Sequence, residues 1–261
     1  MIRAIIAAAF LASPAVGLEI SAEHDIVILG EVHDNGLHHQ GQADLIRKLD
    51  PKAVVFEMLS PEQADMLNAM PRENMDDVAQ RLDWTNSGWP GFSLYRPIFE
   101  ALSDRPAIGA AAPREQVRRA FGEGAAAVFG AEAEVFGLTQ AIPEDQLNAR
   151  KELQFSAHCE AMPLDMMGGM VEAQRFRDAA FAAATLAALE AYGSPIVLIA
   201  GNGHARIDWG VPFLLETASP ETSVLSIGFV ETPGTADDPR FHHTIVTDPA
   251  ERGDPCDAFK S

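Results

Sequence analysis

The chain has 261 residues, of which 38 are acidic and 19 are basic, so its formal net charge at pH 7 is −19. So acidic a surface repels nucleic acid and anionic membranes, which excludes nucleic-acid binding as the function. Hydrophobic residues make up 47% and charged residues 22%, as in a globular protein with a substantial core. The length suits one large α/β domain and is too short for three ordinary ones.

The N-terminal residues have the pattern of a secretory signal peptide. Arg3 gives a short positive region, residues 4–12 form an unbroken apolar run, and residues 13–17 offer small side chains to a signal peptidase. The run is too short for a permanent membrane anchor, and a buried first helix is the alternative interpretation. The sequence therefore predicts a signal peptide over 1–17 and a single α/β domain over 18–261. We expect this domain to be exported, periplasmic or otherwise outside the cytoplasm, with no integral membrane segment.

Apolar runs that end at glycine or at turn residues predict the first elements of the mature chain. A buried strand is predicted over 25–30, a helix over 40–49 and a second buried strand over 53–58. Pro61 then begins a helix, at a position where its missing N–H costs nothing. Residues 71–95 are polar and rich in turn residues, and they are predicted to be helix followed by loop.

The strands and helices continue to alternate to the end of the chain. Because the strands are continuous apolar runs, we expect a mostly parallel central sheet flanked by helices on both faces. Residues 114–192 are almost entirely helical and predict a helical layer or cap. In chain order, the remaining predicted elements are a helix that follows Tyr95-Arg96-Pro97 and ends at Leu102, a strand over 107–110, helices over 114–136, 144–158 and 171–192, a strand over 195–200, a helix over 211–216, and strands over 223–230 and 241–246.

Two cysteines, Cys159 and Cys256, are present in the sequence. Export to an oxidising compartment favours a disulfide between them, and two free, buried thiols are the alternative. A disulfide here would join the C-terminal tail to the middle of the chain. Closing a loop of about 100 residues stabilises the folded state by about 4 to 5 kcal/mol in the chain-entropy model.

Two G-x-x-H turns, at 30–33 and 201–204, directly follow predicted strands, and Glu57 ends another strand. Ligands of parallel α/β folds bind beyond the carboxyl ends of the strands, so these turns are predicted to meet at one edge of the sheet. Two imidazoles and two carboxylates suit either a divalent metal or acid–base hydrolysis, although each residue alone is also explained as a hydrogen-bonded loop residue. The candidate metal-ligating or catalytic residues are Glu31, His33, Glu57 and His204.

Further polar residues are candidates to surround this set. His39 either faces the site or lies in a solvated helix start. Arg206 and Asp208 follow His204 and are candidates to orient it. One face of the helix over 171–192 carries three polar side chains, which either join the site or form a solvent-exposed, salt-bridging face. These three residues are Gln174, Arg177 and Asp178.

Tyr95 lies in an aromatic and apolar segment, 89–97, that is predicted to be a loop leading into a helix. A phenolate can ligate ferric haem iron, but residue chemistry alone favours a packed core tyrosine. Other reaction classes lack their motifs, because the sequence has no phosphate-binding glycine loop, no G-x-S-x-G elbow and no H-E-x-x-H. Nucleotide and serine-hydrolase chemistry are therefore disfavoured.

Several short motifs together resemble the ChaN-like haem-binding proteins, which belong with the Tiki/TraB and erythromycin-esterase-like proteins. The matches extend from residue 28 to about residue 210. They comprise Ile28-Leu29-Gly30-Glu31-Val32-His33-Asp34-Asn35, Glu57 in Val-Phe-Glu, Tyr95-Arg96-Pro97, His158-Cys159, Ala173-Gln174, Arg177-Asp178 and Gly201-Asn202-Gly203-His204-Ala205-Arg206.

This resemblance implies a parallel α/β fold with a helical portion, and a role in haem binding and iron uptake at the bacterial envelope. It implies haem at the interface of a homodimer, with Tyr95 on the iron and a histidine nearby, His204 first and His33 second. Arg96, Gln174 and Arg177 complete the implied haem-binding residues. The wider superfamily implies the alternative, a divalent-metal-dependent esterase or protease that uses Glu31, His33, Glu57 and His204. A non-catalytic binding module, in which the polar cluster only stabilises loops, is the third possibility.

Overall fold

The computed structural model of the protein describes residues 23–254 and 256–257, so the predicted signal peptide over 1–17 lies outside the described residues. Within the described part of the chain, six strands form one sheet in the order β3-β2-β4-β1-β5-β6, and every neighbouring pair is parallel. The predicted parallel α/β fold is therefore confirmed. The strands are β1 (Ile26–Glu31), β2 (Ala53–Phe56), β3 (Ala107–Gly109), β4 (Ile196–Gly201), β5 (Val224–Glu231) and β6 (His243–Thr247).

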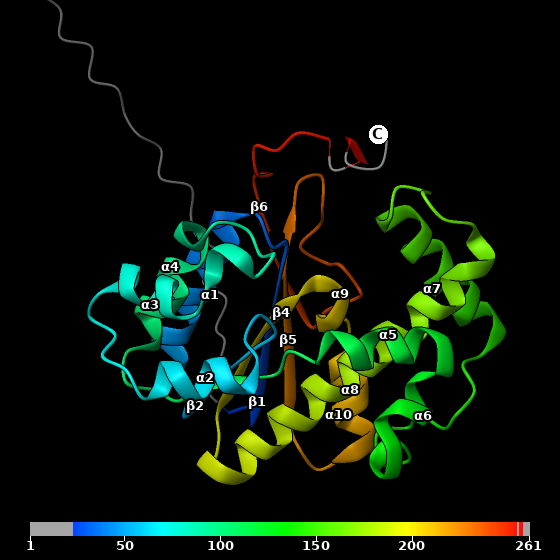
Figure 1. Cartoon of the computed structure of the whole chain (residues 1–261), viewed down its shortest axis with the longest axis horizontal. Coiled ribbons are helices and arrows are strands. Elements are labelled where there is room, and N and C mark those ends of the chain that lie inside the picture. The colour runs from blue at the N-terminus through cyan, green and yellow to red at the C-terminus, as the bar shows by residue number, and fades with distance from the viewer. Residues whose placement is uncertain (1–22, 255, 258–261) are drawn as a thin grey trace, which may run out of the picture.

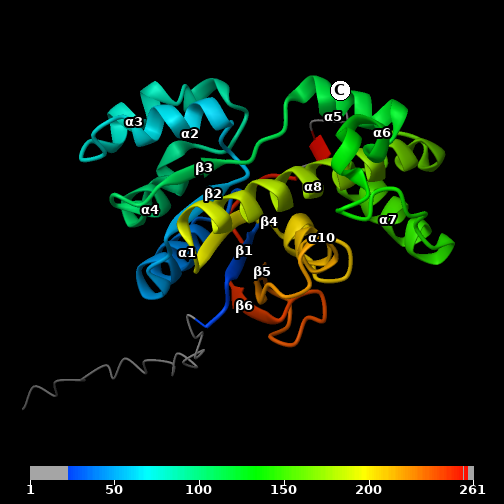
Figure 2. The same ribbon diagram turned by 90° about the horizontal axis from the view of Figure 1, so that it is seen from below.

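Helices cover both faces of the sheet, as Figures 1 and 2 show. One face carries α1 (Gly36–Leu49), α2 (Pro61–Asn68), α3 (Met75–Arg81) and α4 (Phe92–Leu102). The other side carries α5 (Arg114–Glu123), α6 (Ala125–Phe129), α7 (Glu144–Ala157), α8 (Met167–Tyr192) and α10 (Val211–Ala218), which confirms the predicted helical layer. A short helix, α9 (Asn202–Ala205), follows β4, and 3-10 turns lie at Trp84–Asn86, Gly130–Ala133 and Leu164–Met166.

The continuous apolar strands are buried on both faces, which explains their composition. In β1, Val27 and Leu29 join the core beneath α1 and α4, whereas Ile26 and Ile28 join the core beneath α8. All four side chains are fully buried. Successive residues of a strand point to opposite faces, so only an unbroken apolar run can serve both cores.

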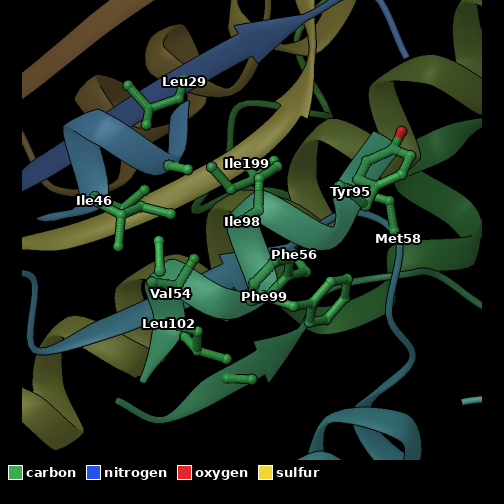
Figure 3. Close-up of a cluster of buried hydrophobic side chains, with 14 of the residues drawn as sticks. Leu29, Ile46, Val54, Phe56, Met58, Tyr95, Ile98, Phe99, Leu102 and Ile199 are labelled. Atoms are coloured by element: carbon green, nitrogen blue, oxygen red, sulfur yellow. The ribbon is translucent and has the colours of Figure 1, made fainter. Parts of the chain in front are cut away.

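Tyr95 lies inside α4 and not in a loop, which corrects the prediction for segment 89–97. The helix contains Pro97, a residue that usually disrupts helices because it lacks an N–H donor. Aromatic packing at helical spacing outweighs this cost, because Tyr95 and Phe99 both enter the core. Figure 3 shows them on successive turns of α4, with Phe99 beside Phe56, whose ring centroid is 5.4 Å away.

The C-terminal tail is fastened to the body of the protein at several points. Arg252 forms ion pairs with Asp34 and Glu231, and the Cys159–Cys256 disulfide joins the tail to the chain just after α7. The predicted disulfide is therefore confirmed. As to membrane spans, no helix within residues 23–254 and 256–257 has both the length and the hydrophobicity to cross a bilayer.

Candidate functional site

The register of the parallel strands brings the two G-x-x-H segments together. Glu31, the last residue of β1, lies opposite Gly201, the last residue of β4. Glu57 follows β2 directly, and its backbone N–H donates to the carbonyl of Ile199 in β4 at 3.1 Å. The carboxyl ends of three neighbouring strands therefore deliver the predicted residues to one edge of the sheet, as expected for this fold.

One part of the site, the Glu31 cluster, consists of Glu31, His33, His39 and Tyr95. Oε1 of Glu31 accepts from the Tyr95 hydroxyl at 2.9 Å and lies 2.8 Å from Nδ1 of His33 and 3.5 Å from Nε2 of His39. The His39 ring also stacks on Tyr95 with centroids 4.0 Å apart, which settles that His39 faces the site. Burial alone would raise the pKa of Glu31, but hydrogen bonds from His33 and His39 lower it to about 2.

The other part, the Glu57 cluster, consists of Glu57, Gln174, Arg177, Asp178 and His204. Glu57 pairs with Arg177, lies 3.4 Å from Nε2 of His204, and accepts from the Gly201 N–H at 2.7 Å. Burial opposes ionisation, but the charges of His204 and Arg177 hold the pKa of Glu57 below its usual range. The polar face of α8 therefore joins the site and is not an exposed salt-bridging face.

His204 is held from both ring nitrogens. Its Nδ1 lies 2.5 Å from Asp178 and 2.9 Å from Nε2 of Gln174, while Nε2 faces Glu57. Burial would lower the pKa of His204, but the negative charges of Glu57 and Asp178 outweigh it and raise the pKa. The side chain of His204 is 5% exposed, and both of its ring nitrogens contact side chains of the network.

Gly201 joins the two clusters, and a larger residue there would displace the His33 ring. A Cβ atom at this position would lie 2.8 Å from Nε2 of His33 and 3.7 Å from Oε2 of Glu57. The imidazole of His33 therefore rests directly on the Gly201 backbone. The close approach explains the first glycine of the second G-x-x-H turn, and it places His33 beside both carboxylates.

A cleft of about 960 Å³ adjoins the Glu57 cluster. Glu57 and Arg177 line it, and so does Trp89, whose ring contacts the His33 ring edge-on with centroids 4.8 Å apart. Its volume lies within the range of pockets that take cofactors and other small ligands. The Glu57 cluster thus borders a space large enough for a ligand, and the Glu31 cluster is joined to that space by the contact between His33 and Trp89.

Three of the predicted surrounding residues lie elsewhere. Arg96 points away from the clusters and pairs with Asp76 at the surface. Arg206 pairs with Asp208 and stacks on Trp209, 3.7 Å from the ring centroid, so neither residue orients His204. Although Arg206 and Asp208 are close to His204 in sequence, their side chains do not contact it. The side chains that orient His204 come instead from α8.

The four predicted metal ligands come close together, and neighbouring side chains contact them. Tyr95 and Arg177 already donate to the two carboxylates, and Asp178 engages His204. Within residues 23–254 and 256–257, no group of three or more His, Cys, Asp or Glu side chains could hold a metal ion. The geometry instead resembles an acid–base or hydrogen-bonding set.

Sequence reasoning missed Arg114, which lines the cleft. It stands at the first position of α5, where the helix dipole disfavours a cation, and this placement was the available signal. In the sequence, Trp89 stands out only as part of an aromatic segment. Its contact with His33 joins residues 56 positions apart, and no local pattern reveals such a pair.

Stability should depend on pH through Glu31. The folded pKa of about 2 lies below the ordinary value of 4.5, so the carboxylate contributes stability above pH 4.5 and loses it as the pH falls toward 2. The shift corresponds to roughly 3 kcal/mol. We expect Glu31→Gln to lower the free energy of unfolding by about this amount at pH 7, as measured by urea unfolding. The difference in unfolding free energy between the variant and the wild type should become smaller below pH 4.5. An equal gap at pH 7 and pH 3 would contradict this assignment.

Comparison with known proteins gives a family match over most of the chain. The family model described as haem-binding uptake, Tiki superfamily, ChaN matches residues 18–215. Among solved structures, ChaN of Campylobacter jejuni, described as binding heme cofacially, is similar with 16% identity and a TM-score of 0.62 over 85% of this chain and 87% of that chain. The type III effector HopBA1 shares 13% identity with a TM-score of 0.47, covering 88% of this chain and 90% of its own. Among curated proteins, none matches this sequence.

Proposed function

This chain belongs to the ChaN family of haem-binding uptake proteins in the Tiki superfamily, and we propose that it binds haem beside the Glu31 cluster as a step in haem or iron uptake. Export to the bacterial envelope is part of the proposal. It is supported by the signal-peptide pattern over 1–17 and by the Cys159–Cys256 disulfide, since disulfides persist in oxidising compartments.

The observation that carries the proposal is the state of His33. Its side chain is 35% exposed, and its Nδ1 is held by the buried carboxylate of Glu31. A carboxylate that holds one ring nitrogen in this way fixes the ring, so Nε2, which lies beside Gly201, is the nitrogen that would meet a metal. If haem binds here, it would supply an iron, and the imidazole of His33 is the side chain that would ligate it.

Tyr95 fits the iron less well than His33 does. The phenol is fully buried, and its hydroxyl donates to Glu31. Burial, together with the negative charge of Glu31, raises the pKa of Tyr95, which opposes the phenolate that iron would need. We therefore assign the iron to His33, with Tyr95 positioning His33 through the shared carboxylate.

Absorbance titration with haemin tests this assignment. We expect the wild-type protein to develop a sharp Soret band at a defined stoichiometry, and His33→Ala to weaken binding at least tenfold and shift the band. Tyr95→Phe should keep the band position, because the phenol is not on the iron. His243→Ala is the control, since this exposed histidine begins β6. An unchanged spectrum for the wild-type protein would overturn the proposed function.

A homodimer around haem belongs to the same proposal. ChaN of Campylobacter jejuni is described as binding heme cofacially, that is, with haem groups face to face. Two copies of this chain would each supply one haem to such an arrangement. Light scattering with and without haemin tests it, because a mass that stays monomeric in both conditions would exclude the dimer.

Hydrolysis is the second candidate function, and the same histidine favours it. An imidazole with Nδ1 on a carboxylate and Nε2 free is also placed to act as a general base toward water. The contacts of Glu31 and Glu57 favour an acid–base reaction over the metal-dependent one. Ester hydrolysis that resists chelators and is lost in His33→Ala would support this candidate, and its absence from wild-type protein would remove it.

A further inference from the structure

The cleft beside the site has two distinct walls. Trp89, from the loop between the 3-10 turn at Trp84–Asn86 and α4, lies on one wall, together with residues at the start of α2. The other wall comes from α5 and α8, which contribute Val117 and Phe181. These side chains make much of the lining apolar and aromatic, so the cleft suits a ligand with a broad apolar body.

Arg114 crosses from one wall to the other. It begins α5, and its Nη2 donates to the carbonyl of Ser87 at 3.1 Å. It has no carboxylate partner within the part of the chain that the structure describes. A cation at the first position of a helix opposes the helix dipole, so helix stability does not account for it.

Arg177 brings a second guanidinium to the same cleft from α8. Its side chain is 31% exposed, it pairs with Glu57, and it lies over the Phe181 ring, 5.6 Å from the centroid. A guanidinium has five N–H donors, so the pair with Glu57 leaves donors for a ligand. The acid Glu62 also lines the cleft, but its carboxylate accepts from the Ser60 hydroxyl at the N-terminus of α2.

We propose that Arg114 and Arg177 bind the carboxylates of the ligand, and that these carboxylates are the two propionates of haem. The inference rests on the proposed function and adds to it the ligand class that the cleft selects. Paired arginines recognise carboxylates through charge-assisted, often bidentate hydrogen bonds. The chain has a net charge of −19, so most of its surface repels an anionic ligand, whereas the two arginines attract one locally.

Three porphyrins and one matched pair of variants test the proposal. Haemin has iron and free propionates, its dimethyl ester has iron and blocked propionates, and protoporphyrin IX has free propionates and no iron. We expect Arg114→Gln to weaken haemin and protoporphyrin IX at least tenfold and to leave the ester unchanged. Arg119→Gln on the same helix is the control, because Arg119 pairs with Glu123 at the surface.

The outcomes separate this inference from the proposed function. An equal loss for haemin and its ester would assign Arg114 a structural role, through its bond to Ser87, and would overturn the inference. Unchanged affinity for all three porphyrins in Arg114→Gln would overturn it as well. A third outcome is that Arg114→Gln weakens protoporphyrin IX binding, but haemin bound to the wild-type protein shows no shift of its Soret band. This outcome would support the carboxylate site and would contradict ligation of the iron by His33. Wild-type protein that binds none of them would overturn both.

Discussion

Glu57→Ala is expected to lower the free energy of unfolding by about 3 to 5 kcal/mol, the cost of removing one partner from a buried ion pair. Glu57 is 1% exposed and is contacted by Arg177, His204 and the Gly201 N–H. Without the carboxylate, the guanidinium of Arg177 loses its ion-pair partner beside His204, and the N–H of Gly201 loses its acceptor. The raised pKa of His204 should also fall, because the charge of Glu57 is a principal cause of it.

Urea unfolding at pH 7 measures this loss, and two variants serve as comparisons. Glu62→Ala removes an exposed glutamate from the same cleft and should change stability by less than about 0.5 kcal/mol, as surface substitutions usually do. Glu57→Gln keeps the shape of the side chain and the acceptor for the Gly201 N–H but removes the charge. Its loss of unfolding free energy should therefore lie between those of Glu62→Ala and Glu57→Ala. A loss below about 1 kcal/mol in Glu57→Ala would mean that the cluster does not depend on this carboxylate.

The strands and the edge that carries the site could be predicted from local pattern alone. Each strand is a short apolar run, and a parallel sheet collects the residues that follow such runs at one edge. Local pattern therefore places Glu31, His33, Glu57 and His204 at the same edge of the sheet. The boundary of α1 was less predictable, since the helix begins at Gly36 through a cap from the Asn35 side chain.

Partners from distant segments could not be predicted, because they depend on how helices pack over the sheet. Asp178 reaches His204 from α8, 26 positions earlier in the chain, while the nearer Arg206 turns away. Likewise, the motif Tyr95-Arg96-Pro97 gave two adjacent candidates, but helical geometry buries Tyr95 and exposes Arg96. The sequence indicates that these residues matter, whereas direct contact with a ligand is decided by tertiary packing.

Removing the disulfide with Cys159→Ser/Cys256→Ser is expected to destabilise the protein by about 4 to 5 kcal/mol in the chain-entropy model. The cross-link spans 97 positions, so the unfolded chain loses much of its freedom when the loop is closed. In the folded state the tail is already held beside the site, because Arg252 pairs with Asp34 and Glu231. The cross-link therefore acts mainly on the unfolded state, and its loss should lower the thermal midpoint by on the order of 10 °C.

Reduction of the wild-type protein provides the matched control, because it breaks the same bond without changing the sequence. Reduced wild-type protein and the double variant should melt together, and a reductant should not shift the double variant. Haemin affinity should change little in the double variant if the ion pairs of Arg252 hold the tail by themselves. Removing that anchor as well, with Arg252→Gln added to the double variant, should then free the tail from Asp34, the neighbour of His33. The double variant could instead prove as stable as the oxidised protein. That result would show that the tail and α7 separate from the core before global unfolding, and that the disulfide contributes nothing to the free energy of global unfolding.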